Sequence, residues 1–323
     1  MRIGYKLCSE ERDPAGLVQD ARAAEAAGFD FAAISDHFHP WLDAQGESPF
    51  VWTTLGAIAA STDRITVGTA VTCPTVRMHP ALVAQAAATA AALLPGRFFL
   101  GVGTGEALNE HIYGDPWPGP STRREMLREA VEVLRRLWTG DLVNFDGRYY
   151  ALEGARIYTL PERRIPVYVA ASGEEAASLA AEIGDGLIVA GVSQEALDAY
   201  GADAGVGPRL AEIVVNADDD ERRAIETIRA VWPNSGIPGE LSAELPLPRH
   251  FEQAASVVRA EDLRGSATIG TDPRPYVDKL HELARAGFTH VFLHQVGSDQ
   301  ERFFRFARDA LMPAVREAFA QAA

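Results

Sequence analysis

Cysteine is scarce in this chain of 323 residues: only Cys8 and Cys73 are present, and no CxxC pair occurs. Two thiols are too few for a disulfide framework, and their spacing does not match a cysteine-based zinc motif. The cysteine content therefore excludes the small disulfide-stapled and zinc-ribbon classes and favours a reducing compartment.

Long hydrophobic runs are also absent from the sequence. No stretch reaches the roughly 18 apolar residues that a membrane-spanning helix needs. The beginning of the sequence, MRIGYKLCSEERDP, has no apolar run of the kind found in secretory signal peptides. We therefore expect a cytoplasmic protein with no membrane partner.

Positive charge is in deficit. The 30 Lys and Arg residues are outnumbered by 45 Asp and Glu residues, which gives a formal net charge of −15. Because nucleic acids bind to clustered positive charge, we do not expect a nucleic-acid partner. The hydrophobic content of 47% is ordinary for a folded protein, and we expect the partner to be a small-molecule substrate.

What the sequence does contain is a regular alternation of short apolar runs and helical patterns. Because parallel strands need crossover helices, and eight such units close into a barrel, we predict an α/β fold, a (β/α)8 TIM barrel formed by residues 1–323 as a single domain. A doubly wound sheet is the alternative, but it usually has fewer strands and would leave the last units unexplained. The eight predicted strands are residues 2–7, 29–35, 64–73, 97–103, 166–172, 186–191, 209–217 and 289–296.

Two segments interrupt this alternation, after the fourth and the seventh strand. Residues 141–160 place Asp146-Gly147 between two β-rich runs, which predicts a hairpin. Residues 233–266 are rich in proline and glycine and have no clean period, which predicts an insertion. The last helix is predicted to begin at Ser298, with Glu301 completing a capping box.

The second predicted strand ends in SDHFHPW, residues 35–41, which puts an acid, two imidazoles and an indole where a barrel enzyme has its active site. A metal site, a proton-transfer site and a structural corner are the competing explanations. A metal site needs three or more converging ligands. The fifth and sixth strands end in YVAAS and IVAGVS, which offer no such ligands, and His294 is the only other well-placed imidazole. We therefore expect no metal at His37 and His39.

Glycines at the end of the fourth predicted strand form a second candidate site. The stretch GVGTGE, residues 101–106, lets the backbone approach a planar or anionic ligand. It lacks the GxGxxG spacing of a dinucleotide-binding fold and lies in the fourth unit, so NAD is not expected. Ser172 and Gly173 precede a predicted helix whose first N–H groups suit a phosphate, although a plain helix cap is the alternative.

Segments spread over nearly the whole chain carry a family resemblance. The sequence is similar to the luciferase-like barrel superfamily and, within it, to the F420-dependent glucose-6-phosphate dehydrogenase family. The matching stretches are SDHFHPW, RITVGTAVTCPTVRMHPALVAQAAAT, PGRFFLGVGTGEALNE, LWTGDLVNFDGRYY, IPVYVAASG, GDGLIV and HVFLHQVGSDQERF. The resemblance implies a homodimer and coenzyme F420 as the hydride-carrying cofactor; FMN is the alternative cofactor, because similar sequences use flavin.

The resemblance also implies roles for individual residues. His37 would accept the hydroxyl proton as hydride leaves an alcohol carbon, Trp41 would pack at the ring, and Glu106 would exchange a proton with the deazaflavin. Ala70-Val71 falls where the family has a cis peptide bond behind the ring. The implied cofactor-binding residues are Asp36, Ala70, Val71, Cys73, Thr104, Gly105, Asn109, Ser172, Gly173, Glu175 and Ala176.

The sequence departs from the family pattern where a sugar phosphate would bind. The family's two lysines and arginine that grip the phosphate fall at Ser193, near Ser242 and near Ser266, and a threonine that touches the sugar becomes Ala190. Because a phosphate dianion needs several charged donors, we predict that glucose 6-phosphate is not the substrate. Ala190, Ser193 and His294 are the expected substrate contacts.

The leading hypothesis is thus an F420-dependent oxidoreductase that transfers a hydride between a small alcohol, carbonyl or unsaturated substrate and the deazaflavin. The alternatives are an FMN-dependent luciferase-like monooxygenase, a deazaflavin carrier without catalytic activity and, as an outsider, a metallohydrolase.

Overall fold

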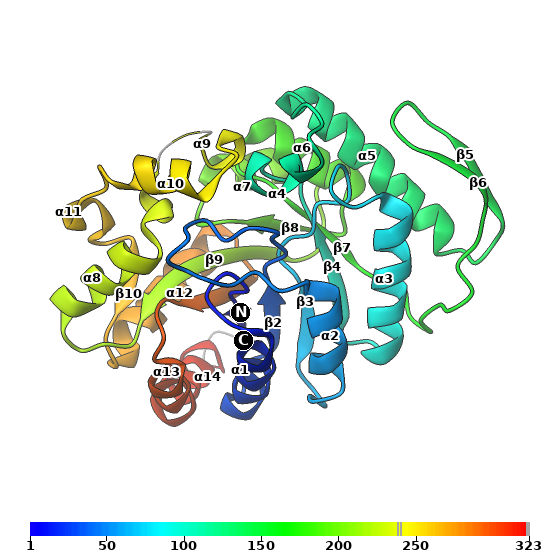
Figure 1. Cartoon of the computed structure of the whole chain (residues 1–323). Helices are drawn as coiled ribbons and strands as arrows, with labels where there is room; N and C mark the ends of the chain where they lie inside the picture. The colour runs from blue at the N-terminus through cyan, green and yellow to red at the C-terminus, as the bar shows by residue number, and fades with distance from the viewer. Residues whose placement is uncertain (238, 240, 321–323) are drawn as a thin grey trace.

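The computed structural model describes residues 1–237, 239 and 241–320, and in this part of the chain eight parallel strands close into a barrel (Figure 1). Around the barrel the order is β9-β11-β1-β2-β3-β4-β7-β8, and β8 pairs with β9 to complete the circle. The predicted (β/α)8 architecture is confirmed. The barrel strands are β1 (Arg2–Leu7), β2 (Phe31–Ile34), β3 (Thr66–Thr69), β4 (Phe98–Val102), β7 (Val167–Ala170), β8 (Gly186–Val189), β9 (Arg209–Asn216) and β11 (His290–Gln295).

Helices surround the barrel, and several of them begin with a proline that fits the first helical turn because its missing N–H is not needed there. Pro14, Pro80, Pro120 and Pro273 occupy this position. The surrounding helices are α1 (Pro14–Ala27), α2 (Val51–Ala59), α3 (Pro80–Leu93), α5 (Pro120–Leu137), α6 (Glu174–Ile183), α7 (Gln194–Ala202), α8 (Glu221–Val231), α12 (Pro273–Ala286), α13 (Gln300–Phe306), the π-helical segment η3 (Ala307–Leu311) and α14 (Met312–Ala320).

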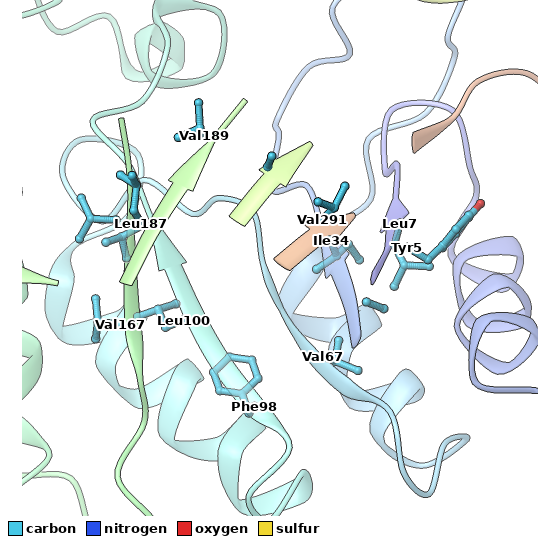
Figure 2. Close-up of a cluster of buried hydrophobic side chains, with 14 of the residues drawn as sticks. Tyr5, Leu7, Ile34, Val67, Phe98, Leu100, Val167, Leu187, Val189 and Val291 are labelled. Atoms are coloured by element: carbon cyan, nitrogen blue, oxygen red, sulfur yellow. The ribbon is translucent and has the colours of Figure 1, made fainter. Parts of the chain in front are cut away.

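The main core lies between the outer face of the barrel and these helices. Alternate residues of each strand point outward, so β1 contributes Ile3, Tyr5 and Leu7, which are at most 2% exposed. Figure 2 shows this layer, with Leu100, Val167 and further side chains from neighbouring strands on the same face. Burial of this apolar surface supplies the main driving force for closing the barrel.

The opposite faces of the strands fill the inside of the barrel with aromatic rings at one end. Phe31 lies 6.3 Å from both Phe99 and Phe292, ring centroid to ring centroid, in edge-to-face arrangements. A side chain at Gly4 would collide with the ring of Phe31, and one at Gly68 with the ring of Phe99. These two glycines therefore make room for the rings, as a packed barrel interior requires.

Short helices and strands are added to the eight βα units after β4, after α5 and after α8. Residues 141–160 contain an antiparallel hairpin of β5 (Val143–Asp146) and β6 (Ala151–Ala155), which projects from the body beside α5 (Figure 1). Residues 233–266 contain η2 (Pro233–Gly236), α9 (Leu241–Glu244), α10 (Pro248–Ala255) and α11 (Ala260–Leu263). The sequence patterns missed β10 (Ala267–Ile269), which pairs with the end of β9. After β4, the short α4 (Ala107–Glu110) and η1 (His111–Tyr113) cover the barrel mouth.

The predicted start of the last helix is wrong by one residue. The N-cap of α13 is Asp299, whose side chain accepts a hydrogen bond from the Arg302 backbone N–H, so Ser298 and Glu301 do not form the capping box. A carboxylate caps a helix at least as well as a hydroxyl. Asp299 therefore occupies the N-cap position in place of Ser298. Among the described residues, no helix combines the length and apolar character needed to cross a bilayer.

Candidate active site at the barrel mouth

His37 follows β2 at the carboxyl end of the barrel and faces a buried carboxylate. Its Nε2 lies 3.4 Å from Oε1 of Glu10, which follows β1, and its Nδ1 lies 3.3 Å from the backbone oxygen of His39. The His37 side chain is 9% exposed and that of Glu10 is 1% exposed. The strand pairing of β1 with β2 brings the two side chains together at adjacent strand ends.

Glu10 is held in its ionised form at neutral pH. Burial alone would raise the pKa of its carboxyl group, but the charges of His37 and Lys6 and a hydrogen bond from Ser35 lower that pKa to about 2. The Ser35 hydroxyl donates to Glu10 Oε2 at 2.5 Å. Sequence reasoning did not single out Glu10, although its place just beyond the first strand was a usable signal.

Trp41 packs between His37 and the insertion. Its ring centroid lies 4.9 Å from that of His37 and 5.0 Å from that of Phe251 in α10. Ile237 and Leu245 from the same insertion join this apolar cluster. The segment after β9 thus covers the predicted catalytic imidazole with apolar side chains.

Asp36, next to His37, is bound by buried donors. Thr72 Oγ1 donates to its Oδ2 at 2.7 Å, and the Arg77 guanidinium donates to its Oδ1 at 2.9 Å. Arg77 also faces Glu110, with Nε 3.6 Å from Oε1, and its backbone N–H donates to Oε2. Burial raises the pKa of Glu110 to about 7, against the opposing effect of Arg77. Arg77 and Glu110 lie within the matching stretches but were not singled out, because neither residue shows its partner in the sequence.

Asn109 joins the His37 loop to the loop of Glu106. Its Oδ1 accepts hydrogen bonds from the backbone N–H groups of Phe38 and His39 at 2.9 and 3.2 Å, and its Nδ2 donates to Glu106 Oε2 at 3.3 Å. Asn109 is 1% exposed, so its amide is committed to these contacts. Asn109 therefore connects the loop of His37 with Glu106 at the carboxyl end of the barrel.

The loops after β3 and β4 are packed closely against one another. The Ala70–Val71 peptide bond is cis, at the position that the family resemblance implies. Thr104, Gly105 and Glu106 are partly exposed at the mouth, whereas Cys73 is buried beneath them with its thiol 2.9 Å from the Thr75 hydroxyl. Cys73 therefore supports the glycine loop from below.

The start of α6 offers unoccupied backbone donors. Gly173 is its N-cap, no side chain caps the helix, and a side chain at Gly173 would meet no atom within 4 Å. Ser172 is exposed and Ala176 is partly exposed beside it. Glu175 instead pairs with Arg124 and is 75% exposed, so its carboxylate points to the surface.

Three residues predicted to contact substrate have different surroundings. Ala190 is exposed after β8, and Ser193 caps α7 by accepting a hydrogen bond from the Ala196 N–H. His294 is fully buried, with Nε2 3.4 Å from Glu11 Oε1 and Nδ1 3.2 Å from Glu212 Oε1. Contact of these residues with substrate stays a prediction.

The second imidazole of the motif, His39, makes contacts of its own. Its Nδ1 lies 2.9 Å from the Leu108 backbone oxygen, and its ring stacks on that of His111 at 5.7 Å. The two imidazoles thus each place a ring nitrogen against a backbone carbonyl.

Comparison with known proteins identifies the family. The profile of the luciferase-like monooxygenase family matches residues 1–290. The chain belongs to the luciferase-like family. It is 39% identical to the F420-dependent glucose-6-phosphate dehydrogenase of Mycolicibacterium fortuitum and 38% identical to that of Mycobacterium tuberculosis H37Rv, with 98% of each chain covered in both cases.

Solved structures of this family superpose closely. An F420-dependent secondary alcohol dehydrogenase in complex with an F420-acetone adduct gives a TM-score of 0.91 at 30% identity, covering 98% of this chain and 99% of that one. The coenzyme F420-dependent tetrahydromethanopterin reductase of Methanopyrus kandleri gives a TM-score of 0.79 at 23% identity, covering 97% and 99%, and shows the shared fold. The predicted family is confirmed.

Proposed function

We propose that this protein is a coenzyme F420-dependent oxidoreductase that transfers a hydride between a small uncharged alcohol and F420, with the carbonyl compound as the product of oxidation. The observation that carries the proposal is the imidazole of His37 set between Glu10 and Trp41 at the barrel mouth, with Glu106 held to the same rim by Asn109. The F420-dependent relatives support the choice of cofactor.

The residues present fit this cofactor. The N-terminus of α6 has uncapped N–H groups and open space beside Gly173, as a phosphate-bearing tail requires. Thr104, Gly105 and Glu106 are partly exposed on the neighbouring strand end, since β4 pairs with β7, which leads into α6. F420 supplies the hydride-accepting ring when bound.

His37 is suited to take the hydroxyl proton of the alcohol. Both of its ring nitrogens face oxygen atoms, Glu10 Oε1 and the His39 carbonyl, and a neutral imidazole can donate to only one of them. With Nδ1 donating to the His39 carbonyl, Nε2 is the nitrogen that would accept the hydroxyl proton, and it makes no hydrogen bond to Glu10. Because Glu10 is ionised at neutral pH, it stabilises the resulting imidazolium by direct charge interaction.

The surroundings of His37 favour an uncharged substrate. Trp41 is packed against Phe251, Ile237 and Leu245, which are apolar. Two cations near this end of the barrel already have partners: Lys6 is buried 2.8 Å from Glu212, and Arg77 pairs with Asp36 and Glu110. A phosphate dianion would need several charged donors at this place.

A cofactor titration and a substrate comparison test the proposal. Quenching of cofactor fluorescence should show tight binding of F420 and weak binding of FMN; the reverse order would favour a flavin monooxygenase. With oxidised F420, small secondary alcohols should bleach the absorbance of the cofactor, whereas glucose 6-phosphate should not. Rapid turnover of glucose 6-phosphate would refute the substrate assignment.

Matched histidine variants separate an enzyme from a carrier. His37→Ala should lose turnover by a factor of about 10² or more while keeping F420 affinity, because a positioned acid-base group contributes about that much. His281→Ala, whose ring stacks on Phe319 instead, is the control and should keep turnover. Equal activity of the two variants would contradict the role of His37.

The family resemblance also supports a cytoplasmic homodimer. Light scattering of the purified protein should give about twice the chain mass of 34.8 kDa; a mass of one chain would contradict it.

A further inference from the structure

Cys8, Glu11 and His294 lie together beneath the predicted hydride-transfer site. Cys8 and Glu11 follow β1, and His294 is in β11, which pairs with β1. Cys8 is 5% exposed, the Glu11 side chain 7% and the His294 side chain 1%. The group brings a thiol, a carboxylate and an imidazole to one point inside the protein, and the proton transfer proposed for His37 involves none of them.

Two of the ligand-atom separations are close to those around a tetrahedral metal. Cys8 Sγ lies 3.7 Å from Glu11 Oε1, His294 Nε2 lies 3.4 Å from the same oxygen, and all three atoms lie within 4.8 Å of one another. Zinc bonds of about 2.3 Å to sulfur and about 2.0–2.1 Å to nitrogen and oxygen place tetrahedral ligand atoms roughly 3.4 to 3.6 Å apart. We propose that Cys8, Glu11 and His294 form a zinc-binding site that joins the end of β1 to β11.

The other polar atoms of Glu11 and His294 face groups that would orient the two ligands. Glu11 Oε2 accepts a hydrogen bond from the Gly297 N–H at 3.1 Å, which leaves Oε1 for the metal. His294 Nδ1 faces Glu212 Oε1 at 3.2 Å, which leaves Nε2. A carboxylate behind the second nitrogen of a metal-binding histidine is the usual arrangement, because it fixes the tautomer and orients the ring.

His294 provides an independent indication of a ligand. Its side chain is 1% exposed, and neither ring nitrogen makes a hydrogen bond of normal geometry within the described residues. The ring of Trp232 packs edge-on against it at 4.4 Å, and water would fill the fourth position of a tetrahedral ion. A buried imidazole without hydrogen bonds carries a cost that metal coordination at Nε2 removes.

The local charge also favours a cation. Three buried carboxylates, Glu10, Glu11 and Glu212, surround this region, and Lys6 is the cation next to Glu212. A divalent ion at the Cys8 thiolate would offset the excess negative charge. Sulfur and imidazole ligands select zinc over magnesium or calcium, which prefer oxygen alone.

This site would act on the active site only through Glu10. Glu10 Oε2 is 3.2 Å from Cys8 Sγ, and Glu10 Oε1 faces His37. A metal that fixes residues 8–11 against β11 would hold this carboxylate in place. The inference does not depend on F420 or on the substrate, because its test measures metal binding by the chain itself.

The experiment uses Zn²⁺ with the full-length protein after removal of bound metal by a chelator. Metal analysis should find one Zn²⁺ per chain, and competition with a chromophoric chelator gives its affinity. Cys8→Ser and Glu11→Gln should weaken Zn²⁺ binding by more than 100-fold, beyond the 10- to 100-fold loss typical when a histidine's carboxylate partner is removed. Glu212→Gln should show that smaller loss.

Cys73→Ser is the matched control, because Cys73 is the other buried free thiol and lies outside the group. It should bind Zn²⁺ as the wild type does. Co²⁺ in the wild-type protein should show thiolate-to-metal absorption in the near ultraviolet and visible bands of a tetrahedral centre. Circular dichroism confirms that each variant is folded, and the cobalt spectrum of the wild type decides the question where a variant is not.

The proposal would be overturned by the absence of stoichiometric Zn²⁺ in the wild type, by unchanged affinity in Cys8→Ser, or by a cobalt spectrum without thiolate absorption. Equal loss of binding in Cys73→Ser would also overturn it, since the effect would not be specific to Cys8.

Discussion

Replacing Glu110 with glutamine tests the buried charge cluster at the barrel mouth. Glu110 is 1% exposed and lies against Arg77, which also binds Asp36. Its Oε1 and the Arg77 Nε are 3.6 Å apart and make no hydrogen bond to each other. The ion pair is therefore imperfect, and desolvation of the carboxylate outweighs it, which raises the pKa of Glu110 to about 7.

The direction of the pH effect follows from this raised pKa. In the unfolded chain Glu110 loses its proton near its ordinary value of 4.5, and in the folded chain only near 7. Between these values the folded chain binds the proton more tightly, so raising the pH favours unfolding. The stability from this group is fully present below about pH 4.5 and is lost as the pH rises through 7. A pKa shift of one unit corresponds to about 1.4 kcal/mol, so the shift from 4.5 to about 7 contributes about 3 kcal/mol to the free energy of unfolding.

Glu110→Gln keeps the shape of the side chain and removes its titration. Urea denaturation of both proteins between pH 4.5 and 8.5 gives the free energy of unfolding of each. The wild type should lose about 3 kcal/mol relative to the variant across this range. A constant difference between wild type and Glu110→Gln at every pH would refute the reasoning.

Three further changes test how the mouth is held together. Phe251→Ala removes a fully buried ring that packs on Trp41; it should cost about 3–5 kcal/mol in chemical denaturation and raise KM for the alcohol. Asn109→Ala should lower kcat at least about tenfold with little change in F420 affinity, because the His37 loop loses the acceptor of two backbone N–H groups; an unchanged kcat would contradict this. Gly105→Ala should lower the free energy of unfolding by about 1–3 kcal/mol, since φ is +80° and the new Cβ would lie 2.6 Å from Cys73 Sγ, and Cys73→Ala should restore part of the loss.

The sequence predicted the fold well because the barrel depends on a local pattern. The strand runs are short and apolar and alternate with helical segments, of which α5 has a clear 3.6-residue stripe, so eight units could be counted without tertiary information. The predicted strand 64–73 was too long, because β3 ends at Thr69 and the chain then turns into the mouth. β10 was missed because its three residues pair only with the end of β9, which no local pattern reveals.

The candidate site was only partly accessible from the sequence. His37, Trp41 and Glu106 occur in compact motifs at strand ends, where position alone suggests function. Glu10, Arg77 and Glu110 act through pairings between distant segments, and a single charged residue in a sequence does not show its partner. The sequence also did not reveal that the Asn109 amide connects two loops, while its predicted contact with the cofactor stays a prediction.

The inside of the barrel changes from apolar to charged along single strands, and this ordering explains how the site tolerates so many buried ions. On β1, Gly4 makes room for the Phe31 ring, Lys6 two residues later binds Glu212, and Glu10 beyond the strand end faces His37. Every second residue of a strand points into the barrel. At a given level of the barrel, the inward side chains of neighbouring strands are therefore either mostly apolar or mostly charged. Lys6 and Glu10 each face an oppositely charged or titratable group, Glu212 and His37, which lowers the cost of burying them. A change in one of these pairs leaves the next carboxylate without compensation, so double variants of Lys6 and Glu10 should depart from additivity.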